Sequence, residues 1–192
     1  MAVRLQGRAG YPKDTPFVPT FHPDRLNEPE LIKKSARIFV CSMGELFDPK
    51  LSEIATDLVL KEIAKNPRHT FQILTKRPDR AEKWIFPSNV WLGCSQDCES
   101  THWDEIDHIR NALAPSVRFV SFEPLLAPFY GSLASIDWVI VGAQTGPNAM
   151  RPEKHWVSVI LEMCDDLDIP VFLKSNLNWP EKRQEFPKVG KK

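Results

Sequence analysis

Cysteine is scarce in this 192-residue sequence, with four residues scattered along the chain. Four scattered thiols are too few for a disulfide-rich secreted scaffold, so we expect all of them to be reduced. Cys41 and Cys94 lie in apolar segments and Cys164 lies on a helix face, where free cysteine behaves as a small buried hydrophobe. Cys98 follows Cys94 at a spacing that suits two thiolates, but no histidine or further cysteine follows at a zinc-site distance. We therefore predict no metal site.

An excess of charge and long apolar runs are also absent. Lys and Arg number 25 and Asp and Glu number 25, for a formal net charge of zero. This balance removes the broad basic footprint of a dedicated nucleic-acid-binding protein, but it leaves room for a local basic groove. No apolar run approaches the ~20 residues of a transmembrane helix, and the first residues contain no signal-peptide core. We expect a cytoplasmic protein, without a membrane partner, that folds as a single domain.

Short apolar segments and amphipathic segments alternate along the chain. The apolar segments are nearly continuous, as in parallel strands that are covered on both faces. The amphipathic segments repeat apolar residues at three and four positions, as helices do. This alternation predicts an α/β fold with a parallel sheet. The predicted strands are 37–43, 70–76, 90–96, 118–125, 138–146 and 171–176, the predicted helices lie within 51–63, 103–113 and 156–164, and a helical turn is expected in each of 77–86 and 127–135.

Polar residues follow every predicted strand, and this distinguishes between two α/β architectures. Such residues would meet at one mouth, as the strand ends do in a (β/α) barrel. A doubly wound nucleotide-binding sheet would carry a glycine-rich turn after its first strand, and neither G-x-G-x-x-G nor a P-loop occurs here. Six strands predict an incomplete (β/α) TIM-type barrel over 37–176. Residues 1–36 are expected to form an extended arm, and 177–192 a basic, frayed tail.

Glu123 is the strongest candidate for chemistry, because it ends a predicted strand in the segment F-E-P-L-L. A carboxylate in that position can act as an acid or a base, or it can bind an amine or a hydroxyl group. The alternative is a structural salt bridge with Lys76, Arg77 or Lys174. One hypothesis for the function is therefore acid–base catalysis by Glu123 and Lys174 in a barrel without a cofactor.

Two further strand ends carry candidate ligand-binding groups. The segment Thr75 to Arg77 offers a hydroxyl and two cations to a carboxylate or phosphate, or it is simply the solvated start of a helix. The segment Ser42 to Glu45 joins a close-approach glycine to a carboxylate. The five histidines show no metal-ligand spacing, and no serine lies in G-x-S-x-G, so a metal hydrolase and a serine hydrolase have no support.

Six ordered motifs together resemble a known family. They are R-I-F-V-C-S-M-G-E-L-F, H-T-F-Q-I-L-T-K-R-P-D-R, N-V-W-L-G-C-S, V-R-F-V-S-F-E-P-L-L, I-D-W-V-I-V-G-A-Q-T-G-P and V-F-L-K-S-N. Over residues 1–179 the sequence resembles the phage gp-thirty-seven/gp-sixty-eight family, an uncharacterised family of phages, prophages and bacterial chromosomes. Its members look like radical S-adenosylmethionine enzymes, in which three cysteines hold an iron–sulfur cluster that binds the cofactor. The resemblance implies a cofactor site formed by Ser42, Glu45, Thr75, Lys76 and Gln144.

Two departures from the family pattern change what the resemblance implies. In relatives the three cysteines precede a segment like M-A-V-R-L-Q-G-R-A-G-Y-P, with which this sequence begins. Either the sequence has been started at an internal methionine, or the protein is a truncated relative. In this form, we expect it to be catalytically inactive and to hold no iron–sulfur cluster. In addition, Gln144 stands where relatives more often have glutamate. A different class of function is a cofactor-free phage factor that binds nucleic acid or another ligand through Lys76, Arg77 and Lys174.

Overall fold

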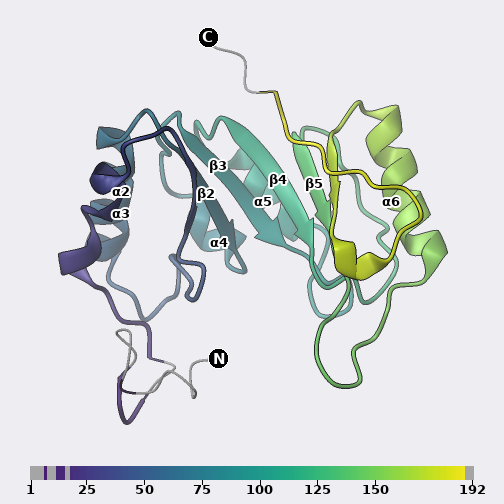
Figure 1. Ribbon diagram of the computed structural model, residues 1–192, viewed down its shortest axis with the longest axis horizontal. Coiled ribbons are helices and arrows are strands. Elements are labelled where there is room, and N and C mark those ends of the chain that lie inside the picture. Colours follow the sequence, from purple (N-terminus) through teal and green to yellow (C-terminus); the bar gives the residue numbers. More distant parts are fainter. Residues whose placement is uncertain (1–6, 8–11, 16–17, 189–192) are drawn as a thin grey trace.

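A single six-stranded sheet forms the centre of the molecule in the computed structural model, which describes residues 7, 12–15 and 18–188. Every neighbouring pair of strands is parallel, and the strands lie side by side in sequence order. The sheet curls into a half-barrel (Figure 1). The strands are β1 (Arg37–Val40), β2 (Thr70–Thr75), β3 (Val90–Ser95), β4 (Val117–Phe122), β5 (Trp138–Val141) and β6 (Val171–Leu173).

The sequential strand order places the connecting helices on one side of the sheet. Because the order never reverses, right-handed crossovers return along the same face, as in a barrel and unlike a doubly wound fold. Figure 1 shows α3 and α6 at the two flanks and α5 behind the sheet. The predicted α/β class and parallel sheet are thus confirmed. The helical elements are η1 (Pro23–Arg25), α2 (Glu28–Leu31), α3 (Glu53–Lys65), α4 (Pro78–Ala81), α5 (Glu105–Asn111), α6 (Lys154–Asp166) and η2 (Ser175–Leu177).

Two short connections between strands were expected to contain helical turns, and only one does. The turn in 77–86 is α4, where Pro78 occupies the first helical position. The turn in 127–135 was a wrong prediction, because none of these described residues is helical. Pro128 offers no backbone N–H, and Ser135 has a φ of 62°, outside the right-handed helical region. Within the described part of the chain, no helix is long and apolar enough to cross a membrane.

The main hydrophobic core lies between the helices and the outer face of the sheet. Leu92 of β3 and Phe122 of β4 are fully buried there, together with Ile109 of α5 and Ile160 of α6. Full burial of each such side chain contributes roughly 1.5–3 kcal/mol. The outer face of the sheet is therefore the main source of stability.

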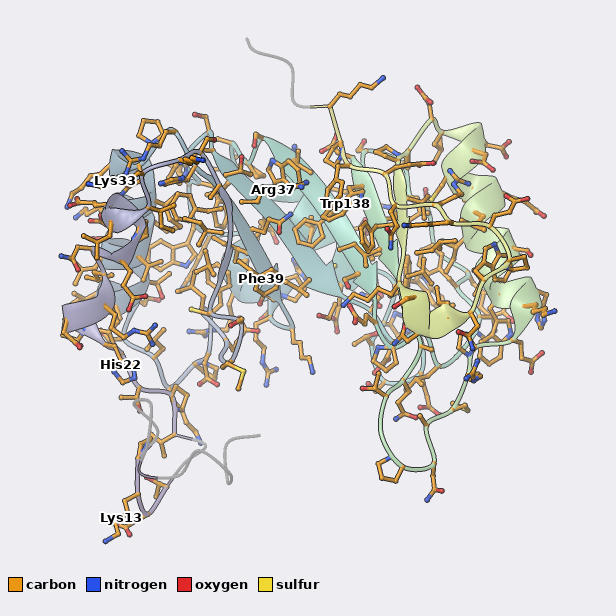
Figure 2. The ribbon with its side chains drawn as sticks, in the orientation of Figure 1. Lys13, His22, Lys33, Arg37, Phe39 and Trp138 are labelled. Atoms are coloured by element: carbon orange, nitrogen blue, oxygen red, sulfur yellow. The ribbon has the colours of Figure 1, made fainter. Side chains whose placement is uncertain are left out.

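A second, smaller core lies on the inner, concave face. It consists of Trp91, Val117, Phe119 and Trp138, the alternate residues of strands β3 to β5. Gly93 makes this packing possible, since a Cβ atom there would lie 2.5 Å from the Phe119 ring. Figure 2 shows Trp138, together with Arg37 and Phe39 of β1, on this face, in front of the sheet. The inner face is thus aromatic and lies on the side of the sheet opposite α5.

The segment after β6 is held against the sheet as far as Phe186. Gln184 forms an antiparallel bridge with Phe172, and the Leu173 amide donates to the Arg183 carbonyl at 2.7 Å. The ring of Phe186 lies 5.3 Å, centroid to centroid, from that of Trp138. The sequence predicts a frayed basic tail here because a lone aromatic among charged residues gives no periodic pattern. The last four residues, 189–192, lie outside the described residues.

Candidate functional site

A groove of about 1040 Å³ lies between β1, β2 and the N-terminal arm. Its walls include Phe39 and Leu74 from the inner face of the sheet, and Ile32 from the arm. Its polar end is formed at the carboxyl ends of the strands, which is where barrel folds build their sites. Of the predicted site residues, the groove is lined by Ser42, Glu45 and Lys76.

Glu45 links the end of β1 to the end of β2. Its Oε1 accepts hydrogen bonds from the Thr75 hydroxyl at 2.7 Å and the Phe47 amide at 3.1 Å, and its Oε2 accepts from the Lys76 amide at 2.9 Å. A carboxylate has about four acceptor positions, so about one remains free for a ligand. Thr75 lies behind Glu45 and holds it in place, and the predicted residues Glu45, Thr75 and Lys76 form one cluster.

The ammonium group of Lys76 is available at the same edge. Lys76 is exposed and lines the groove, and it forms no ion pair with any of the described residues. Gly44 was expected to allow a close approach, and a close approach by a ligand stays a prediction. A Cβ atom at Gly44 would meet nothing within 4 Å, so the space beside it is open. An unpaired cation therefore stands next to a fixed carboxylate.

Glu123 and Lys174 form a second cluster across β4, β5 and β6. The Lys174 ammonium donates to Glu123 Oε1, and both side chains pass beside Gly142, the residue that follows β5. A Cβ atom at Gly142 would lie 3.1 Å from Glu123 Cγ and 3.4 Å from Lys174 Cδ. The side chains are 30% and 41% exposed for Glu123 and Lys174, so the pair is accessible to a ligand. The sequence offered Lys76, Arg77 and Lys174 as partners of Glu123, and in the structure the partner is Lys174.

Ser121 belongs to β4, two residues before Glu123, and was not among the predicted site residues. It is 1% exposed, and its Oγ has no hydrogen-bond partner among the described residues. Strand alternation places Ser121 on the same inner face as Phe119, and it is in register with Ser95 and Ile140. A buried hydroxyl without a partner costs roughly 1–3 kcal/mol, so such groups occur where a ligand or water completes them. Its position in the strand order was the available clue.

Gln144 lies apart from both clusters, on the exposed loop after β5. Its Oε1 accepts a hydrogen bond from the Met150 amide at 2.8 Å, which fixes the loop. Gln144 is not among the residues that line the groove. A role in ligand binding stays a prediction for this residue.

The cysteines do not form a cluster site. Cys94 and Cys164 are buried, as expected, and burial raises the pKa of each thiol to about 12. Burial and the nearby Asp97 raise the pKa of Cys98 to about 12 as well. Cys41 was expected to be buried within a strand, and this was wrong: β1 ends at Val40, and Cys41 is exposed with a φ of 52°.

No three His, Cys, Asp or Glu side chains among the described residues are grouped so that they could hold a metal ion. An iron–sulfur cluster is held by several cysteine thiolates that lie close together, and the described cysteines form no such group. The described residues therefore do not fit an iron–sulfur cluster.

Comparison with known proteins gives a family but no activity. The sequence matches over residues 1–192 the family described as "Protein of unknown function (DUF5131)". The chain belongs to this family. Searches of curated proteins and of solved structures found no match. The family description names no substrate or cofactor, so membership of the family does not identify a reaction.

Proposed function

We propose that this member of the DUF5131 family binds S-adenosylmethionine in the groove at the mouth of its half-barrel. The observation that carries the proposal is the pairing of an apolar wall, Phe39 and Leu74, with opposite charges at the strand ends, Glu45 and Lys76. S-adenosylmethionine has a flat adenine ring and a zwitterionic amino-acid end. The ring suits the apolar wall, the carboxylate suits Lys76, and the amine or a ribose hydroxyl suits the free acceptor position of Glu45.

The proposed activity is binding and not radical chemistry. The described residues do not fit an iron–sulfur cluster, and the radical reaction of S-adenosylmethionine depends on electron transfer from such a cluster. The proposed function therefore contains no radical step. The residues that line the groove, Ser42, Glu45 and Lys76, support recognition of the cofactor, in line with the family resemblance, and Thr75 holds Glu45 in place.

The pair of Glu123 and Lys174 supports a second candidate, acid–base chemistry on a ligand that reaches across β4 to β6. The two side chains are in direct contact and partly exposed, and Ser121, whose hydroxyl is unpartnered among the described residues, lies two residues before Glu123. Proton exchange between a ligand and this pair requires such access. The nucleic-acid alternative has less support, because the Glu123 carboxylate neutralises Lys174 and leaves Lys76 and Arg77 as the cations of the mouth.

Isothermal titration with S-adenosylmethionine tests the proposal. We expect saturable binding by the wild-type protein and by Lys33→Met, a matched loss of one exposed positive charge on the arm. Lys76→Met should weaken binding by about tenfold or more, because it removes a charge-assisted bond of about 1.5–3 kcal/mol. Glu45→Gln should also weaken binding.

Methionine, adenosine and S-adenosylhomocysteine identify which part of the cofactor is recognised. The last of these lacks the sulfonium charge. No saturable binding of S-adenosylmethionine, or equal affinity in the wild type and Lys76→Met, would refute the proposed function.

A further inference from the structure

The guanidinium group of Arg37 is exposed and lies on an aromatic ring, and it is not paired with a protein acceptor among the described residues. Arg37 is the first residue of β1 and lies on the concave face (Figure 2). Its side chain forms no hydrogen bond or ion pair with the described residues, so its five N–H donors are open. The contact recorded for the group is with a ring: its central carbon lies 3.8 Å from the ring centroid of Phe186.

Most other arginines of the described chain donate to protein acceptors. The guanidinium groups that donate to a carboxylate, a carbonyl or a ring nitrogen belong to Arg25, Arg68, Arg80, Arg110, Arg118 and Arg183. Arg77 also has no such acceptor and is exposed, as Arg37 is, but among the described residues only Arg37 of these two makes a contact with a ring. The Arg37 guanidinium therefore has N–H donors that are free of protein acceptors, and its contact with the Phe186 ring holds the guanidinium plane in one orientation.

The stacking contact prepares this group for a planar anion. A guanidinium that lies on an aromatic ring keeps its edge free, and its forked donors match the two oxygens of a carboxylate or phosphate. Phe186 is itself fixed, because it packs against Trp138 at 5.3 Å and Phe172 at 5.4 Å between ring centroids. Less side-chain entropy is lost when a side chain is already held in its binding orientation.

The surface next to Arg37 is aromatic and partly open. Phe39 is 46% exposed and Phe186 is 39% exposed. Phe39 lies two residues after Arg37 on the same face of β1, about 7 Å along the strand. Phe39 also lines the groove, whose polar end is at Glu45 and Lys76. An aromatic wall thus runs from the mouth towards the open guanidinium.

We propose that Arg37 anchors a second ligand on the concave face, a planar aromatic molecule that carries a carboxylate or a phosphate. The oxyanion pairs with the edge of the guanidinium, and the ring packs on Phe39. The proposal extends the proposed function, since it names the class of molecule that would lie beside the cofactor on the same face. Both aromatic acids and nucleotides have this chemistry.

Titrations with phenyl phosphate, benzoate, adenosine monophosphate and inorganic phosphate test this inference. Binding is followed by calorimetry and by tryptophan fluorescence, because Trp138 is in contact with Phe186. We expect saturable binding of an aromatic anion by the wild type and by Lys33→Met. The preferred ligand among the three aromatic anions distinguishes an aromatic acid from a nucleotide. Inorganic phosphate should bind more weakly than phenyl phosphate, because it has no ring for Phe39.

Variants at Arg37 provide the decisive comparison. Arg37→Met should weaken binding by about tenfold or more, since it removes a charge-assisted pair. Arg37→Lys keeps the positive charge but loses the forked donors of the guanidinium, so it should retain part of the affinity. This variant provides the test if Arg37→Met fails to fold. Phe186→Leu should weaken binding because it removes the stacking surface. Circular dichroism establishes that each variant is folded.

The inference is refuted if Arg37→Met and Arg37→Lys bind the aromatic anions as tightly as the wild type does. It is equally refuted if no aromatic anion binds saturably, or if inorganic phosphate binds as tightly as phenyl phosphate. Failure of the proposed function can be told apart from failure of this inference. Lys76→Met should weaken binding of S-adenosylmethionine but leave binding of phenyl phosphate unchanged. Arg37→Met should weaken binding of phenyl phosphate but leave binding of S-adenosylmethionine unchanged.

Discussion

The two faces of the same sheet differ in how completely they are packed. On the outer face, strand residues such as Leu92 and Phe122 meet helices and are fully buried. On the inner face, Trp138 and its neighbours on β3 to β5 form a compact, buried cluster, whereas Phe39 of β1 is nearly half exposed. Both faces are built from alternate residues of the same strands.

The outer face therefore contributes mainly to the stability of the fold, whereas the inner face carries polar groups that are available to a ligand. The outer face has few polar groups, and its side chains are covered by the helices that connect the strands. The inner face carries the open donors of Arg37, the orphaned hydroxyl of Ser121 and the partly exposed pair of Glu123 and Lys174. A buried hydroxyl without a partner is destabilising unless a ligand or water completes it, and the exposed polar groups of this face are accessible to a ligand.

The largest expected effect of a substitution is on the outer face. Leu92→Ala should lower the free energy of unfolding by about 2–5 kcal/mol, because it opens a cavity in a core that cannot collapse around it. Leu74→Ala, the matched change on the half-buried inner face, should cost clearly less. Urea denaturation of both variants measures the difference. Equal losses would show that the inner face is packed as tightly as the outer one.

A smaller effect is expected for the pair of Glu123 and Lys174. Breaking a fully buried pair costs about 3–5 kcal/mol, but exposed pairs contribute about 1 kcal/mol or less. The exposure of both side chains places this pair near the lower value, so Glu123→Ala and Lys174→Ala should each change the free energy of unfolding by about 1 kcal/mol or less. Thermal melts of both single variants and the double variant provide the coupling energy.

A large loss in each single variant, recovered in the double variant, would instead make the pair structural. The sequence predicts that Lys76 and Glu123 point to one mouth from two different strands. The structure gives each its own cluster, with Lys76 beside Glu45 and Glu123 beside Lys174. Lys76→Ala should therefore leave the contribution of Glu123 to stability unchanged.

Much of the fold could be predicted from the sequence because strands that are covered on both faces have a strong local pattern. Continuous apolar segments identified all six strands, and the polar residues after each one indicated the mouth. Strand ends were less predictable. Cys41 continues the apolar segment of β1 but leaves the strand in a left-handed conformation, which the hydrophobic pattern does not encode.

The site could be predicted only where a residue type was distinctive at a strand end. Glu45, Lys76, Glu123 and Lys174 were predicted in this way, and their roles in binding or catalysis stay predictions. Ser121 and Arg37 were missed for a different reason. Each is unremarkable in sequence, and its importance lies in having no acceptor or donor nearby, which depends on every neighbour in three dimensions.

The smallest expected effect is a difference in thiol reactivity between the two faces. Cys41 is exposed and lines the groove, whereas Cys94 and Cys164 are buried among the outer core residues. Iodoacetamide should therefore label Cys41 first in the folded protein. Labelling is quantified by mass spectrometry of the digested protein. Labelling of Cys94 at the rate of Cys41 would contradict the tight packing of the outer face.

The pH dependence of this labelling also reports on Glu45. Although Cys41 is an exposed residue, surrounding protein atoms partly desolvate its thiol, and this desolvation, followed by the Glu45 carboxylate, raises the pKa of Cys41 above its usual value. Only the thiolate reacts, so labelling should be slow at neutral pH and should accelerate as the pH rises through the raised pKa. Glu45→Gln removes the charge contribution and lowers the pKa of Cys41, so labelling at a fixed pH should become faster. S-adenosylmethionine in the groove should slow the reaction in the wild type, and an unchanged rate at saturating cofactor would place the cofactor away from β1.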